Sequence, residues 1–213
     1  GFAATGISWI VLSLFGALPF CLSGEIPNYV DALFEIVSGF TTTGASILSD
    51  VEALSRCNLY WRSFSHWLGG MGILVFLLAV VPEARKSAGS GMYLMRAESP
   101  GPSVGKLTPH LRQTALILYG LYMLLTVLCI GFLLLGGMPL FDSLCIAFGT
   151  AGTGGFAIPN RGMADYSAYL QKVVTVFMFL FGVNFSLYYL LLLRQFKSVF
   201  KNEELRLYAG IAV

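Results

Sequence analysis

The sequence predicts an all-α membrane protein with two repeated units, each made of a helix, a short re-entrant segment and a second helix. Composition is the first reason: hydrophobic residues make up 56% of the chain, charged residues 11%, and the mean hydropathy is +0.76. A transmembrane helix needs about 20 apolar residues to cross a hydrocarbon core of roughly 30 Å. Four stretches without a charged residue reach that length: residues 1–24, 63–82, 113–141 and 173–193.

The second reason is a short threonine- and glycine-rich element that occurs twice, 111 positions apart, each time between two of the uncharged stretches. Each copy ends a segment that opens with an aspartate and has a leucine two residues later, at Asp31 in the first copy and at Asp142 in the second. Self-similarity at a fixed spacing indicates a structural repeat. The candidate site residues of the two copies are Thr42, Thr43, Gly44, Thr153, Gly154 and Gly155.

The first predicted unit covers residues 1–82. Its first spanning helix is expected at about Ile7 to Leu22, where Pro19 near the outer end is a potential kink. A helix at about Val30 to Gly39 is too short to cross a membrane and leads into the first Thr/Gly copy. The second spanning helix is expected at about Trp61 to Val81.

The second predicted unit covers residues 113–194 and has the same order of elements. A cytoplasmic linker at 83–112 is expected to join the two units. Residues 195–213 are expected to form a cytoplasmic tail and the start of a third unit. The helices of the second unit are expected at about residues 113–135, 139–149 and 172–193.

The charge distribution predicts the orientation in the membrane. Residues 83–112 and 194–206 together carry nine basic and four acidic residues, and such loops stay in the cytoplasm. The Thr/Gly copies should therefore face the outside. The net charge of +2 follows from this bias and gives no reason to expect nucleic-acid binding. The opposite side carries Glu25, Asp31, Glu35, Asp50, Glu52, Asp142 and Asp165, with Arg56, Arg62, Arg161 and Lys172.

The two Thr/Gly copies are predicted to contribute to a cation-selective filter. Irregular backbone at membrane depth is tolerated only where it is buried in protein or lines a cavity. Glycine reaches positive φ without steric cost, so successive carbonyls can turn toward an ion and replace part of its hydration shell. The C-terminal end of each short helix would also favour a cation. The alternative is that the glycines only let helices pack closely.

Several other residues favour structural roles. Asp31 and Asp142 are expected to be helix-start acids, and Gly69–Gly72 should allow close packing. His66 is expected to pack or to form hydrogen bonds, while Asn184 either links helices or lines the pore. No catalytic constellation occurs in the sequence, so no enzyme is expected, and no cofactor besides the transported ion. The four cysteines are expected to be ordinary buried thiols: Cys21, Cys57, Cys129 and Cys145.

Segments 38–45, 62–72, 96–102 and 154–156 resemble the TrkH branch of the Trk/Ktr/HKT potassium transporters. The resemblance implies potassium uptake across the inner (plasma) membrane through four such units per chain, arranged like a fused tetrameric potassium channel. It also implies a homodimer in membrane lipid and a cytoplasmic nucleotide-binding regulatory subunit like TrkA. By the same resemblance, Gly44 and Gly155 are filter glycines, Thr42, Thr43, Thr153 and Gly154 are their filter neighbours, and K⁺ is the ion.

Other interpretations remain open at this level. A sodium or ammonium pathway could use the same scaffold, and a structural membrane subunit could carry the repeats without transport. A membrane enzyme would need converging ionisable groups at a cavity, and the predicted spans have almost none. The apolar residues at both ends of the sequence favour an excerpt of a longer protein over a two-repeat subunit that dimerises.

Overall fold

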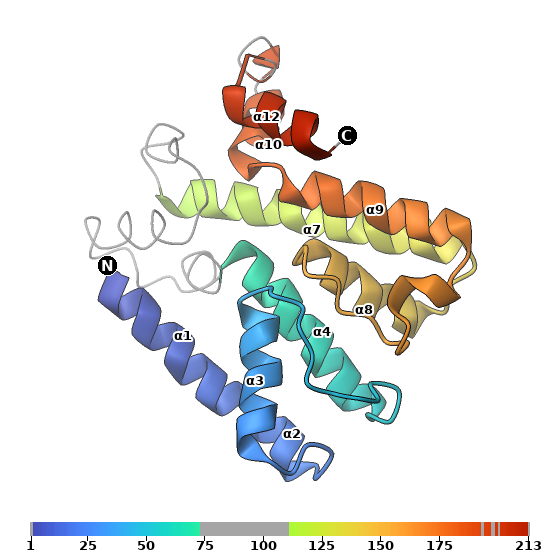
Figure 1. Cartoon of the computed structure of the whole chain (residues 1–213). Coiled ribbons are helices and arrows are strands. Elements are labelled where there is room, and N and C mark those ends of the chain that lie inside the picture. The colour runs from blue at the N-terminus through green and yellow to red at the C-terminus, as the bar shows by residue number, and fades with distance from the viewer. Residues whose placement is uncertain (1, 73–110, 193, 197–198, 200, 213) are drawn as a thin grey trace.

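The computed structural model describes residues 2–72, 111–192, 194–196, 199 and 201–212 (Figure 1). Within these residues the regular structure is helical and contains no strand. Most of the predicted linker, residues 83–112, lies outside the described residues, as does the C-terminal half of the predicted second span.

The described part of the first unit, residues 2–72, contains four helices: α1 (Phe2–Gly16), α2 (Leu18–Leu22), α3 (Tyr29–Phe40) and α4 (Arg56–Met71). The first predicted span is divided into α1 and α2 at Ala17, which is consistent with the predicted kink. Pro19 is within the first two residues of α2, where a missing N–H group is tolerated. The Asn28 side chain accepts a hydrogen bond from the Val30 N–H group and begins α3.

The second unit contains α7 (Leu111–Leu135), α8 (Leu140–Ala151), the 3₁₀-helix η3 (Gly162–Asp165), α9 (Ala168–Gly182) and α10 (Phe185–Leu192). A further helix, α12 (Glu203–Ala212), follows. Helices α3 and α8 begin and end at positions that are 111 residues apart, as the repeat predicts. Ser55 and Ser167 both cap the helix that follows the turn, because each side chain accepts a backbone N–H bond.

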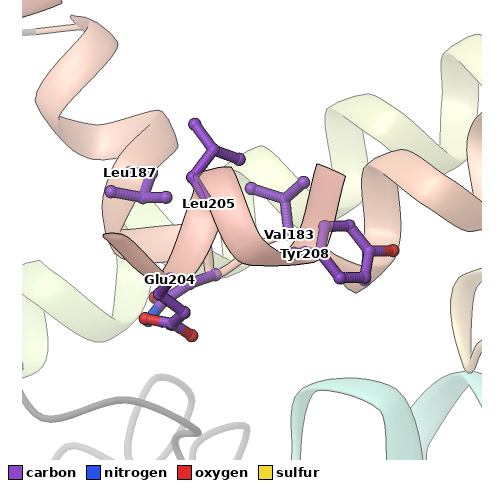
Figure 2. A pocket seen from close by; sticks show the side chains of 7 residues that line it. Val183, Leu187, Glu204, Leu205 and Tyr208 are labelled. Carbon is purple, nitrogen blue, oxygen red and sulfur yellow. Dashed lines mark hydrogen bonds between the residues drawn. The ribbon is translucent and has the colours of Figure 1, made fainter. Parts of the chain in front are cut away.

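The last predicted span is broken, which corrects the single helix expected at residues 172–193. Helix α9 already begins at Ala168, and α10 turns away from it by 85°. Val183 has extended backbone between the two helices, and the Asn184 side chain accepts a hydrogen bond from Ser186 N–H at 3.0 Å. This cap gives α10 its own N-terminus in a new direction. The Asn184 amide also donates to the Glu204 carboxylate of α12 at 3.3 Å, so Asn184 links helices. Figure 2 shows the small pocket at this junction, where Val183 and Leu187 face Glu204, Leu205 and Tyr208 of α12.

Among the described residues, one helix is long and apolar enough to cross a membrane unaided, residues Leu116–Leu135 within α7. The bent pair α9 and α10 would make a second if it is treated as one span. The other predicted spans are shorter within the described residues: the first is Gly6–Leu22, with a turn at Ala17, and the second is described only as far as Gly72.

Helix α4 joins the two units by packing against α3 on one side and α8 on the other (Figure 1). Trp67 of α4 lies in the apolar core of the second unit, with Tyr122 of α7 and Phe148 of α8. The Trp67 indole donates to Thr126 Oγ1 at 3.1 Å, and the Tyr122 hydroxyl donates to the Trp67 carbonyl oxygen at 2.9 Å. These bonds hold α4 against α7 and bring the segments that follow α3 and α8 close together.

Candidate functional site

Both short helices end where the Thr/Gly copies begin. We call residues 42–44 the first turn and residues 153–155 the second turn. Thr42 donates its N–H group to the Gly39 carbonyl oxygen at 3.0 Å, and Thr153 donates to that of Thr150 at 2.9 Å. These two bonds occupy matching repeat positions. Each turn therefore follows directly from a helix C-terminus, whose partial negative charge favours a nearby cation.

The two turns share an unusual backbone. Thr42 has φ 55° and Thr153 has φ 56°, while Gly44 has φ 74° and Gly155 has φ 79°. Positive φ is uncommon for residues other than glycine and is a genuine outlier for a β-branched side chain. Such a conformation costs on the order of 1–3 kcal/mol and persists only where its surroundings impose it. Its recurrence at matching threonines indicates that both turns need this conformation.

Hydrogen bonds from the preceding helix stabilise the first turn. The Thr43 N–H group donates to the Ser38 carbonyl oxygen at 3.0 Å, and the Ser38 hydroxyl donates to the Ala45 carbonyl oxygen at 2.5 Å. In the second turn the acceptor is the matching residue, Gly149, but the donor is shifted by one position: Gly155 N–H donates to the Gly149 carbonyl oxygen at 3.2 Å. Each turn thus has N–H groups that bind to its own helix.

The carbonyl oxygens of the turns, unlike several of their N–H groups, form no hydrogen bond within the described residues. Within the described residues, no hydrogen-bond donor reaches the carbonyl oxygen of any residue in the first or the second turn. Thr43, Thr153 and Gly155 are exposed, and Thr42, Gly44 and Gly154 are half-buried, so water or an ion can reach this backbone. These oxygens are therefore available to a ligand that accepts electron pairs, and a cation is such a ligand.

The two turns lie against each other although they are far apart in sequence. A Cβ atom at Gly44 would lie 2.7 Å from the Gly154 carbonyl carbon, and one at Gly154 would lie 2.6 Å from the Thr42 carbonyl oxygen. Neither position has room for a side chain. A Cβ atom at Gly155 would meet only the methyl carbon of Met178, at 3.9 Å. Gly155 is therefore required by its positive φ rather than by a lack of space.

His66 of α4 packs behind the second turn. Its ring is fully buried and lies against the positions that Cβ atoms would take at Gly152 and Gly154. The ring also meets Phe156 edge-on, with centroids 4.5 Å apart. Neither ring nitrogen has a hydrogen-bond partner among the described residues. The packing role that the sequence favoured for His66 agrees with this placement.

Other residues singled out from the sequence lie around this site in structural roles. Asp31 and Asp142 are in the first turns of α3 and α8, and the Tyr166 hydroxyl donates to Asp142 at 3.4 Å. All four cysteines are free thiols. Cys129 and Cys145 are buried as expected, but Cys57 is exposed, so the expectation of buried thiols was wrong there. Cys57 lies in the first turn of α4, and Cys21, near the end of α2, is half-buried.

The ion pair between Glu35 and Arg62 is the feature that the sequence did not reveal. Both residues were counted only as charges on the outer side. In the structure, the Arg62 Nε atom donates to Glu35 at 2.5 Å, and the exposed fractions of the side chains are 4% for Arg62 and 0% for Glu35. The available signal was one acid in the middle of an apolar helix and one base at the start of an apolar span. A pairing across 27 positions could not be read from either.

The chain is similar to known cation transporters over nearly its whole length. The profile of the TrkH family, described as "Cation transport protein", matches residues 1–209. The potassium uptake protein TrkG of Escherichia coli is 38% identical over 217 aligned residues, which cover 100% of this chain and 44% of that protein. The potassium uptake protein TrkH of Salmonella typhimurium is 38% identical, with 99% of this chain and 44% of that protein covered.

A solved structure has the same fold. The crystal structure of the potassium transporter TrkH from Vibrio parahaemolyticus matches with a TM-score of 0.70 and 32% sequence identity. The match covers 89% of this chain and 37% of that chain, so this chain spans less than half the length of the relatives that it matches. In this chain, the turns that follow the two short helices meet at Gly44 and Gly154. On the family match and these relatives, the chain belongs to the TrkH family of cation transport proteins.

Proposed function

We propose that this protein takes up potassium ions across the cell membrane, and that the first and second turns form half of its selectivity filter. The observation that carries the proposal is the pairing of the two turns: the same positive φ angles at matching positions, and direct contact between Gly44 and Gly154. Two strained turns that meet, each with carbonyl oxygens that no donor in the described part of the chain reaches, provide a set of oxygen ligands for one ion. Close packing alone would require the glycines but not the strained threonines.

The mechanism requires no covalent chemistry. Carbonyl oxygens of Thr42, Thr43, Gly44, Thr153, Gly154 and Gly155 replace water around the passing ion. The C-terminal ends of α3 and α8 add partial negative charge behind these oxygens. The membrane potential drives uptake with about 2.3 kcal/mol per charge for each 100 mV. No cofactor takes part, and K⁺ is cargo.

Potassium is preferred over sodium or ammonium because the matched relatives from E. coli and S. typhimurium are named potassium uptake proteins. A structural subunit without transport is the competing interpretation. It gives no account of why a threonine at the matching position of each turn has a strained, positive φ.

A filter must surround its ion, so the two turns need partners of the same kind. We propose that the functional protein has four such units per chain, as the greater length of the relatives allows. We propose further that it forms a homodimer in the inner membrane, and that a nucleotide-binding regulatory subunit like TrkA contacts its cytoplasmic face. The name "Trk system", which the relatives carry, fits a protein that works with other components.

The orientation can be tested separately. The charge bias of residues 83–112 and 194–206 supports a cytoplasmic position for these segments, with the turns toward the outside. A single cysteine at Ser90, in a background without the native cysteines, should react with an impermeant thiol reagent only from the inside. Labelling from the outside would invert the topology.

The function itself is tested by ion flux. The full-length native protein, reconstituted in liposomes, should pass K⁺ and should favour it over Na⁺ and NH₄⁺ at equal concentration. Equal K⁺ and Na⁺ fluxes would favour a non-selective or sodium pathway. Absence of any cation flux from properly inserted protein, with and without its regulatory subunit, would favour the structural interpretation.

A further inference from the structure

The buried ion pair between Glu35 and Arg62 contacts both turn regions at once. The Glu35 carboxylate accepts hydrogen bonds from Ser46 Oγ at 2.9 and 3.1 Å and from the Ile47 N–H group at 3.1 Å. Ser46 and Ile47 follow the first turn. Glu35 therefore holds the segment through which the chain leaves that turn.

Arg62 extends the same network to the other repeat. Its Nη1 atom donates to the Ala157 carbonyl oxygen at 3.1 Å, and its guanidinium carbon lies 3.6 Å from the centre of the Phe156 ring. Phe156 and Ala157 follow the second turn. The guanidinium thus uses one edge for Glu35, another for Ala157 and its face for Phe156, which only arginine can do.

The residues that are held occupy matching places in the repeat. Ser46 comes two positions after Gly44, and Ala157 comes two positions after Gly155. The second unit has no equivalent pair of its own, because the position that matches Glu35 is the buried Ile146. The positions that correspond to Arg62 on α9 are Val173 and Val174. One ion pair in the first unit therefore serves the exits of both turns.

A buried ion pair is weak evidence for a role in stability. Removing two charges from water costs about as much as their attraction returns, and apolar residues of similar volume often stabilise a protein equally well. What an apolar pair cannot do is bind Ser46, Ile47 and Ala157 with directed hydrogen bonds. The network consequently acts on the geometry of the turns more than on the free energy of folding.

We propose that Glu35 and Arg62 are positioning residues that set the separation of the first and second turns and thereby the ion selectivity of the filter. The inference rests on the proposed function, since it concerns the same pair of turns. Neither residue is expected to touch the ion. They act through the backbone of residues 46–47 and 156–157.

The test uses a double variant, Glu35→Leu with Arg62→Met, in the full-length native protein. Because both charges are removed together, no charge is left buried alone, and the variant should fold and insert like the native protein. Its K⁺/Na⁺ flux ratio should fall on the order of tenfold, with a weaker apparent KM for K⁺ and a retained maximal rate. A fall of about tenfold corresponds to about 1.4 kcal/mol in discrimination.

Two further variants make the result specific. The exposed ion pair of Arg161 and Asp165 provides the control, and Arg161→Gln with Asp165→Asn should leave the flux ratio unchanged. Arg62→Lys keeps the charge beside Glu35 but cannot also stack on Phe156 and bind Ala157. Because the charge is kept, this variant should fold. Because the contacts to Phe156 and Ala157 are lost, its K⁺/Na⁺ flux ratio should lie between those of the native protein and the double variant.

The outcomes separate the two proposals. A folded double variant with the native flux ratio and KM would overturn the positioning role and leave the proposed function intact. If the double variant does not reach the membrane, Arg62→Lys decides: a native ratio overturns the inference, and a lowered ratio supports it. Native protein that passes no K⁺ would instead remove the proposed function, and this inference with it.

Discussion

Gly44 of the first repeat and Gly154 of the second lie in direct contact, with the Gly154 carbonyl carbon 2.7 Å from the place of a Cβ atom on Gly44. The contact joins two segments that follow different helices, α3 and α8, and that are more than one hundred positions apart in the chain. It makes glycine necessary at residue 44 for two independent reasons, its φ of 74° and the lack of space.

The first prediction compares the two glycines of positive φ. Gly44→Ala should lower the K⁺/Na⁺ flux ratio by tenfold or more and destabilise the protein, because its Cβ atom overlaps the Gly154 carbonyl group. Gly155→Ala should have a smaller effect, on the order of 1–3 kcal/mol in stability, since only backbone strain opposes it. Flux in liposomes and thermal unfolding in detergent measure both effects.

Gly120 in α7 provides the control for this pair. A Cβ atom there would meet nothing within 4 Å, so Gly120→Ala should leave flux unchanged and stabilise the helix by about 1 kcal/mol. Equal losses at Gly44 and Gly155 would contradict the packing argument.

The second prediction concerns the strained threonines. Thr42→Gly and Thr153→Gly should leave thermal stability unchanged or raise it. The substitution relieves strain of on the order of 1–3 kcal/mol and costs roughly 0.5–1 kcal/mol in conformational entropy. The K⁺/Na⁺ flux ratio should nevertheless fall, because a glycine lets the turn adopt other conformations. A large loss of stability would mean that the threonine side chains stabilise the turns more than the backbone strains them.

The third prediction addresses His66. His66→Ala should destabilise the protein by about 2–5 kcal/mol, because it opens a cavity behind Gly152 and Gly154. His66→Phe should cost much less, since it fills the space and removes two buried nitrogens that have no partner among the described residues. Thermal unfolding of the native protein and the two variants measures these differences in stability. If Phe is as damaging as Ala, the nitrogens bind something essential, such as an ordered water.

The fourth prediction concerns the loops that follow the first and second turns. The Asn160 side chain accepts from Val51 N–H at 2.7 Å and donates to Asp50 at 2.8 Å, and Asn160 N–H donates to Glu52 at 3.0 Å. These bonds join the loop of the first unit to that of the second. Asn160→Ala should cost about 1–2 kcal/mol in stability.

Asn160→Asp should cost more than Asn160→Ala, because it places a third carboxylate beside Asp50 and Glu52. The additional cost should shrink as the pH falls and the carboxylates become protonated. Thermal unfolding at neutral and acidic pH would show this. If the Asn160→Asp variant is as stable to heat as the native protein at neutral pH, the loops are not joined through residue 160.

Much of the local structure was predictable from the sequence. The repeat placed α3 and α8 to within two residues at each end, because an asparagine or proline precedes each helix and a Thr/Gly element follows it. The helix predicted at residues 113–135 likewise corresponds to α7, which begins two residues earlier, at Leu111. These features depend on neighbours in the chain, so periodicity and turn residues suffice to predict them.

The failure at residues 172–193 has a local cause that hydropathy does not register. Val183 and Asn184 are compatible with an apolar span by composition, yet the Asn184 side chain caps a new helix at Ser186. Asparagine competes with the helix for backbone donors in this way, and only the chosen side-chain conformation decides whether it does.

By itself, then, the sequence determined the repeat, the short helices and the glycines at which the backbone can reach positive φ, because each of these depends on residues within a few positions. The positive φ of Thr42 and Thr153 came only with the structure. Only the tertiary structure decided that Gly44 meets Gly154, and that Arg62 reaches from Glu35 to Ala157. Those contacts join residues far apart in the chain, and their geometry follows from how α4 packs between α3 and α8. The charges of Glu35 and Arg62 are visible in the sequence, but their partnership depends on burial, which the fold alone creates.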